Sequence, residues 1–238
     1  MPFRDVTPGT LTTFDLDQRL PGGFRLPARM TAVRTEEGFV ALVSPIPIDE
    51  ERAREIAALG EVRWLVAPNL LHHLYLAEAA ARYPAAKVLA PRGLVAKRGD
   101  LRVDAALEDG VPAELAACLD VLPVLGAPLL DEHAFFHRAS RTLIVTDLVF
   151  NVREPRGLVA NLVLWLVGAH GRLAQSRSWR FFVKDAAAYA ASVDRLVALG
   201  PTTLVMAHGE IVRERAAERL AKALAPGLRR ARPSPALA

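Results

Sequence analysis

The chain has 238 residues, of which 52% are hydrophobic, and it carries a formal net charge of +4. This composition supplies a sizeable core and excludes a disordered chain. Its single cysteine, Cys118, excludes an internal disulfide and a zinc site built from thiolates. The 30 basic and 26 acidic side chains form no run of five like charges, so we expect no nucleic-acid partner.

The first half of the chain alternates segments of strand type and helix type. In order, the sequence predicts two strands within 30–48, a helix after Asp49 that ends at Gly60, a strand at 62–68, a helix at 74–83 and a strand at 87–91. Short continuous apolar strands between helices are typical of a buried sheet in an α/β fold. Two adjacent histidines lie in the turn NLLHH, between the strand at 62–68 and the helix at 74–83.

The second half is less regular but ends in a clear helix–strand–helix pattern. It predicts a strand at 119–124, adjacent strands at 133–138 and 141–151, an apolar helix at 157–170, a helix at 185–200, a strand at 201–210 and a terminal helix at 211–224. The helix at 157–170 is so apolar that we expect it to be buried or to line a partner surface. We expect one domain over residues 1–225, followed by a flexible tail at 226–238.

No membrane-spanning or targeting segment is visible in the sequence. The longest apolar stretch, at 157–171, is interrupted by Asn161 and is too short to cross a bilayer. The N-terminal sequence MPFRDVTPGTLTTFD lacks the apolar segment of a signal peptide. We therefore expect a cytoplasmic protein with no membrane partner.

Polar side chains follow three of the predicted strands at the point where each strand ends. They are Asn69, His72 and His73 after the strand at 62–68, Asp147 after the strand that begins at 141, and His208 in the sequence MAHGE. Ligands of open α/β sheets bind at the carboxyl ends of the strands. Imidazole and carboxylate groups are ligands for zinc, and also for iron or manganese. The combination predicts a shared polar pocket that holds one divalent metal.

Each of these residues also has an ordinary structural interpretation when taken alone. His208 could be a hydrogen-bonded histidine at a strand end, Asp147 a turn former, and the histidine pair an exposed helix start. His133, which follows the acidic residue Glu132, is a weaker candidate for the same pocket. The convergence at three strand ends, rather than any one residue, favours the metal site.

The order of these motifs resembles the metallo-β-lactamase-like hydrolase superfamily. The segments APNLLHHLYLAEAAARYP, APRGLVAKR, PLLDEHAFFHRASRTLIVTDLVFN and MAHGEIV resemble more closely one branch of it, the DUF4336 family, over residues 10–220. The resemblance implies a four-layer αββα sandwich with the site at one edge of two packed sheets. It also implies one or two metal ions, usually zinc, that activate water for hydrolysis.

The superfamily's histidine turn, H-x-H-x-D-H, is degenerate here. Its last histidine corresponds either to His72 or to His73, and in both registers the first two histidines are replaced. A further histidine that the resemblance implies near residues 121–132 is absent. The remaining ligands, His72 or His73 or both, with Asp147 and His208, would suit a single metal.

These considerations predict a metal-dependent hydrolase with one metal ion, zinc before iron or manganese. Water would attack an ester, thioester, lactone or phosphoester; Asp147 would orient that water, and His133 or Glu132 could serve as the acid. The alternative is an inactive relative without metal that acts as a small-molecule binding or interaction module. An iron-dependent redox enzyme is a third, weaker interpretation. Either a small-molecule ligand or a second copy of the chain would be the partner.

Overall fold

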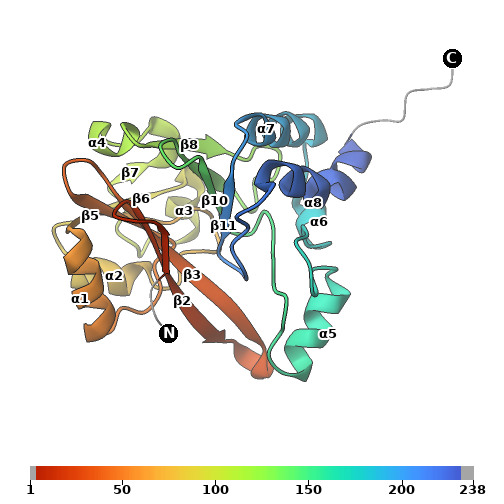
Figure 1. Ribbon diagram of the computed structural model, residues 1–238, viewed down its shortest axis with the longest axis horizontal. Helices are drawn as coiled ribbons and strands as arrows, with labels where there is room; N and C mark the ends of the chain where they lie inside the picture. Colours follow the sequence, from red (N-terminus) through yellow and green to blue (C-terminus); the bar gives the residue numbers. More distant parts are fainter. Residues whose placement is uncertain (1–3, 232–238) are drawn as a thin grey trace, which may run out of the picture.

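Two sheets packed face to face, with helices on both outer sides, make up the computed structural model (Figure 1). The structure describes residues 4–231. Its helices are α1 (Glu50–Leu59), α2 (Leu76–Arg82), α3 (Arg92–Lys97), α4 (Ala113–Ala116), α5 (Leu158–Leu166), α6 (Trp179–Phe182), α7 (Ala186–Ala198) and α8 (Ala216–Ala231). Short 3-10 turns occupy Pro21–Gly23 and Leu107–Asp109.

The first sheet contains seven strands in sequential order: β1 (Arg4–Thr7), β2 (Leu11–Arg19), β3 (Arg25–Arg34), β4 (Phe39–Val43), β5 (Glu61–Val66), β6 (Lys87–Ala90) and β7 (Ala105–Ala106). Strands β1 to β4 pair antiparallel, whereas β4 to β7 pair parallel through helical crossovers. Helix α1 makes the first crossover, and Asp49 caps it by accepting a hydrogen bond from the Arg52 N–H.

The second sheet contains four strands in the order β11 (Thr203–Met206), β10 (Thr142–Val145), β9 (His133–His137) and β8 (Leu119–Pro123). The neighbours β8, β9 and β10 are antiparallel. Strands β10 and β11 are parallel, with Val145 opposite Met206, so their carboxyl ends meet at one edge of the sheet.

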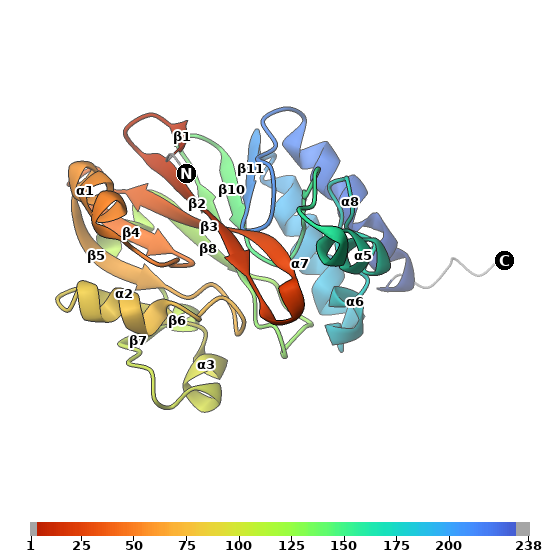
Figure 2. The ribbon, with the colours of Figure 1, turned by 90° about the horizontal axis from the view of Figure 1, so that it is seen from below.

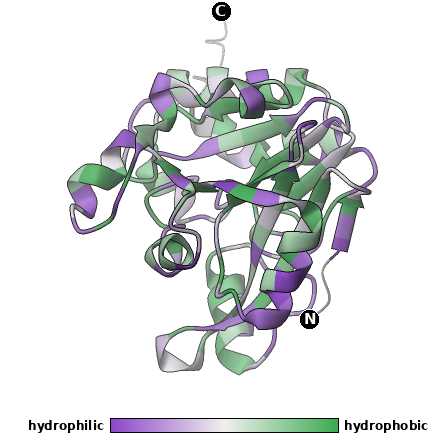
Figure 3. Cartoon of the chain, turned by 90° about the vertical axis from the view of Figure 1, so that its left-hand side faces the viewer, coloured by the Kyte–Doolittle hydropathy of each residue, from purple (hydrophilic) through white to green (hydrophobic). Residues whose placement is uncertain are grey.

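Alternating side chains of the strands fill the cores between the layers. In β10, Leu143 and Val145 pack toward α7 and α8, while Ile144 points to the other sheet and shares a core with Trp64 and Val66 of β5. Figure 2 shows α1 and α2 on one side of the two sheets and α7 and α8 on the other. In Figure 3 the inner strands carry mainly hydrophobic residues. This arrangement confirms the predicted αββα sandwich.

The chain departs from the sequence expectations at both ends. Strands β1 and β2 were not predicted, because the sequence LTTFDLDQR of β2 lacks a continuous apolar run. Helix α8 continues through Pro226 to Ala231, so residues 226–231 of the predicted tail are helical. The reason is that Leu228 still packs against the core beneath α8. The rest of that tail, residues 232–238, lies outside the described residues.

Among the described residues, no helix is both long enough and apolar enough to cross a bilayer.

Candidate metal centre

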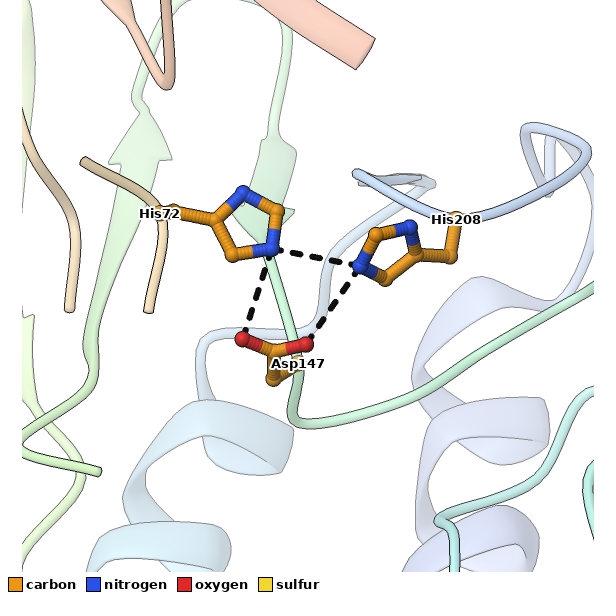
Figure 4. Close-up of side chains that lie close together, drawn as sticks. All are labelled: His72, Asp147 and His208. Atoms are coloured by element: carbon orange, nitrogen blue, oxygen red, sulfur yellow. Dashed lines mark hydrogen bonds and ion pairs between the residues drawn. The ribbon is translucent and has the colours of Figure 1, made fainter. Parts of the chain in front are cut away.

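Three side chains from both sheets meet at the edge where β5, β10 and β11 end. Asp147 and His208 each follow the last residue of their strand by two positions, and because β10 and β11 are parallel neighbours, the two side chains emerge side by side. His72 comes from the loop after β5 in the opposite sheet. Figure 4 shows the two imidazoles on either side of the Asp147 carboxylate.

The ligand atoms of these three residues lie within 4.8 Å of one another. The Nε2 atom of His72 lies 3.3 Å from Oδ2 of Asp147, and Nε2 of His208 lies 3.4 Å from Oδ1. The two Nε2 atoms are 3.2 Å apart. All three side chains are largely buried, with 12%, 11% and 6% of the His72, Asp147 and His208 side chains exposed.

The outer nitrogen of each imidazole has its own partner. The Nδ1–H of His208 donates to the carbonyl oxygen of Pro27 over 2.7 Å, which directs Nε2 toward Asp147. Nδ1 of His72 lies 2.7 Å from Oγ of Ser44. Metal-bound histidines are generally held in this way, by a carbonyl or hydroxyl group on the ring nitrogen that faces away from the metal.

Ser44 adopts a backbone conformation that is rare for a residue with a side chain. Its φ is +56°, in the left-handed region that favours glycine. Strain of this kind persists where the surroundings fix the conformation, and it gathers at functional sites. Here it coincides with the contact between the Ser44 hydroxyl and His72.

Asn69 connects the histidine loop to the aspartate. Its buried Nδ2 donates to Oδ2 of Asp147 over 2.8 Å and to Oγ1 of Thr146 over 3.0 Å. Its Oδ1 accepts from the backbone N–H groups of Leu71 and His72. One amide therefore fixes both the turn that presents His72 and one oxygen of the carboxylate.

Glu132 supports Asp147 from behind. Its Oε1 accepts hydrogen bonds from the N–H groups of Thr146 and Leu148, the two neighbours of Asp147, and from the Thr146 hydroxyl. Burial, and then the nearby charge of Asp147, raise the pKa of Glu132 to about 7. Its other oxygen, Oε2, is buried and has no protein partner. A protonated Glu132 at neutral pH would avoid a second negative charge behind Asp147.

The charges of the cluster are strongly coupled. Burial alone would raise the pKa of Asp147, but His72 and His208 outweigh it and hold the pKa well below its usual range. Burial likewise disfavours protonation of His72, yet Asp147 outweighs it and raises the pKa of the imidazole. The carboxylate is therefore ionised at neutral pH and attracts positive charge to this position.

The loop that carries His208 is held by two further side chains. The buried guanidinium of Arg29 donates through Nη1 to the carbonyl oxygens of Met206 and Gly209, on both sides of His208, and pairs with Asp15 through Nε. The Phe150 ring stacks on the His208 imidazole, with centroids 4.9 Å apart and an interplanar angle of 13°. The imidazole is thus fixed on both its edge and its face.

The donor set fits a divalent metal ion. Two imidazole nitrogens and a carboxylate converge, and a protein group on the outer nitrogen of each imidazole turns its inner nitrogen toward the carboxylate. Two histidines and one carboxylate form a set that zinc uses in catalytic sites with an open position. The same nitrogen and oxygen ligands suit iron or manganese.

Two predicted site residues lie elsewhere. His73 points away from the cluster, with its Nδ1 3.4 Å from Nη1 of Arg98, and burial together with Lys97 and Arg98 lowers its pKa. His133 is buried with Nδ1 facing the carbonyl oxygen of Asp131, and burial lowers its pKa too. The structure therefore brings His72, Asp147 and His208 together, with Asn69 and Glu132 behind them, but neither His73 nor His133.

The residues that support the ligands were not predicted from the sequence. Ser44, for example, has no candidate ligand near it in the chain. Pro27 acts through its backbone, which leaves no sequence signal. Arg29 reaches the site because β3 of the first sheet packs beside the end of β11. Ser44 reaches it because β4 and β5 are neighbours, and Phe150 because its segment follows Asp147 and lies against His208. The sequence signal that could have indicated Arg29 is its place among apolar residues in PARMTAV, because a buried guanidinium needs hydrogen-bond partners.

Solved structures with similar backbones identify the fold. The metallo-β-lactamase DIM-1, in a crystal exposed to ceftazidime, matches with a TM-score of 0.64 and 11% identity over 94% of this chain and 96% of that one. FIM-1 from Pseudomonas aeruginosa, in its mono-zinc form, matches with a TM-score of 0.61 and 15% identity over 98% and 96%.

This chain has the metallo-β-lactamase fold. A metallo-β-lactamase from Pontibacter korlensis, with a TM-score of 0.62, 14% identity and coverage of 94% and 98%, agrees with this assignment. No protein-family model and no curated protein matches the sequence. The metallo-β-lactamase fold that the resemblance implies is therefore confirmed, whereas membership of the DUF4336 branch stays a prediction.

Proposed function

We propose that the protein is a metal-dependent hydrolase with a single-metal centre formed by His72, Asp147 and His208. The observation that carries the proposal is the convergence of three ligand atoms that follow three strand ends, each on a side chain that another protein group also contacts.

Zinc is the metal that we expect, with iron or manganese as the alternatives. The chemistry that such an ion supplies is a lowered pKa for a water molecule, which becomes a nucleophile near neutral pH. The mono-zinc form of FIM-1 is one solved protein of this fold with a single zinc, at 15% identity. It supports the proposal by likeness alone.

Other residues of the chain would hold the ligands in place and shield one side of the centre. Asn69 keeps Oδ2 of Asp147 in place, and Glu132 holds the backbone on both sides of that aspartate. Phe150 shields one face of the His208 imidazole. A substrate with a carbonyl or phosphoryl group, such as an ester, thioester, lactone or phosphoester, would meet this centre at the edge of the two sheets.

Metal content is the first experiment. Protein produced in medium supplemented with zinc, iron and manganese should carry about one equivalent of a transition metal by mass spectrometry after dialysis. His72→Ala, Asp147→Ala and His208→Ala should each lose most of it, because each removes one of three ligands. His73→Ala and His133→Ala are matched controls that should keep the metal. Hydrolysis of p-nitrophenyl acetate, a thioester, a lactone and bis-p-nitrophenyl phosphate would then define the substrate class.

The opposite result would be as clear. Wild-type protein with far less than one equivalent of any transition metal would contradict the hydrolase proposal. Folded variants at the three positions with unchanged hydrolysis would contradict it too. Either outcome would favour the alternative, in which this scaffold binds a small molecule without catalysis.

A further inference from the structure

Helix α5 presents an apolar face that no part of the described chain covers. Its inner residues Ala160 and Leu164 are buried. The outward residues are Leu158, Val159, Leu162, Trp165 and Leu166, which are 89%, 41%, 58%, 66% and 53% exposed. The nine residues of α5 include no charged side chain. A helix that is apolar on both faces, one of them open to solvent, marks a surface for interaction.

Unpaired basic side chains lie beside this helix. A cavity of about 610 Å³ is lined by Arg153, Arg172, Arg177, Arg219 and Lys222, and by no acidic residue. Within the described residues, no carboxylate forms an ion pair with any of these five. Such a group of uncompensated cations attracts an anionic surface or ligand.

The contrast with a second cavity shows that this imbalance is specific. The cavity of about 240 Å³ next to the His208 loop is also rich in arginine, but acidic residues line it as well. There Asp15 pairs with Arg29, and Asp17 pairs with Arg25 and Arg156. Arg153 lines both cavities and is the one arginine of the smaller cavity without a carboxylate partner among the described residues, so the uncompensated cations are concentrated beside α5.

The basic residues and the apolar helix are directly connected. Arg177 donates through Nη1 to the carbonyl oxygen of Leu166, and Arg172 donates to the carbonyl oxygen of Gly168 just after α5. Figures 1 and 2 both place α5, α6 and α8 along the same side of the molecule. On α6, Phe181 adds a further aromatic side chain that is 73% exposed.

We propose that α5 and its basic flank form a docking surface for an anionic lipid bilayer, with the apolar face of α5 in the interface and the arginines against lipid phosphates. Apolar side chains that include tryptophan, flanked by arginine and lysine, bind membranes in this way without crossing them. The sequence expectation of no membrane partner considered spanning segments, whereas this surface would bind peripherally. The proposal is independent of the catalytic one.

The three tryptophans make the test specific. Trp64 and Trp179 are 3% and 2% exposed, so a change in their surroundings would require unfolding, whereas Trp165 is 66% exposed. Vesicles of phosphatidylcholine with 30% phosphatidylglycerol should shift the tryptophan emission to the blue, and brominated lipids should quench it. Trp165→Phe should abolish both signals. Vesicles of phosphatidylcholine alone, or 0.5 M salt, should weaken binding at least tenfold.

Paired variants separate the apolar and the charged contributions. Arg172→Gln with Arg177→Gln should weaken partition into anionic vesicles about thirtyfold at low salt, since each basic residue near the surface contributes about fivefold. Arg54→Gln with Lys87→Gln, two exposed cations next to the first sheet, is the matched control and should change it little.

Leu162→Gln should weaken binding by a similar factor by removing one apolar anchor. Leu129→Gln, at a leucine that is 59% exposed elsewhere, is its control. Melting curves should show that all variants stay folded. Equal binding to neutral and anionic vesicles, or none to either, would overturn the proposal. So would a stable dimer by light scattering in which Trp165 is already shielded from acrylamide without lipid.

Discussion

Replacement of Asn69 by alanine tests the architecture of the candidate centre most directly. The side chain is completely buried and makes four hydrogen bonds, two as donor and two as acceptor. A neutral hydrogen bond contributes about 1 kcal/mol, and one to a charged carboxylate about 1.5–3 kcal/mol. Because the N–H of the exposed residue Leu71 can turn to water, we expect a loss of about 4 kcal/mol in the free energy of unfolding.

Urea unfolding of metal-free protein, followed by circular dichroism, measures this loss. The matched control is Asn161→Ala, because Asn161 also donates twice through Nδ2, to Pro155 and Gly157, and accepts from His170, but lies near the surface. We expect its cost to be below about 1 kcal/mol.

Metal binding gives a second, independent measure of the same variant. Asn69 would act behind the ligands rather than as a ligand, so its loss should weaken metal affinity by about 10–100-fold without abolishing it. A loss of stability similar to that of Asn161→Ala, together with unchanged metal affinity, would refute the role assigned to Asn69.

Three further variants probe the surroundings of the centre. Glu132→Gln should remove a pH dependence of the stability. The raised pKa of Glu132 means that the folded protein binds this proton more tightly than the unfolded one, so wild-type stability should fall by about 2–3 kcal/mol more than that of the variant between pH 5 and pH 8. Urea titrations without metal would measure this difference. His73→Ala should leave metal content unchanged while thermal melting detects the lost packing beside Arg98, and a fall in metal content would return His73 to the ligand set. Gly209→Ala should lower the free energy of unfolding by at least about 3 kcal/mol, because φ is +108° and the added Cβ would collide with the backbone of Asn151; a urea unfolding curve equal to that of the wild type would contradict this.

The positions of Asp147 and His208 could be predicted from the sequence because local rules decide them. Each follows a short apolar strand, and the carboxyl ends of parallel neighbours share one edge of a sheet. The choice between His72 and His73 could not be made in this way. Two adjacent residues at a turn point in different directions, and here the Asn69 side chain, by accepting from the His72 N–H, sets which of them faces Asp147.

The supporting contacts depend on long-range packing. The contact between Ser44 and His72 requires β4 and β5 to be neighbours and a positive φ at a serine, which no sequence pattern announces. The pairing of Arg29 with the His208 loop joins residues about 180 positions apart. His133 was predicted for the same pocket from its position after Glu132, but its Nδ1 faces the carbonyl oxygen of Asp131 and it is not one of the three converging side chains, so a role as the acid stays a prediction.

The centre also ties together two parts of the chain that fold as different sheets. His72 belongs to the first sheet and His208 to the second, 136 positions later, so an ion held by both would act as a reversible cross-link across the sandwich. Ligand binding to the native state alone adds stability in proportion to the logarithm of its concentration, about 4 kcal/mol at a thousandfold excess over the dissociation constant. The melting temperature of this protein would then report how much free metal surrounds it, and a cell short of that metal would hold a looser, more protease-sensitive molecule.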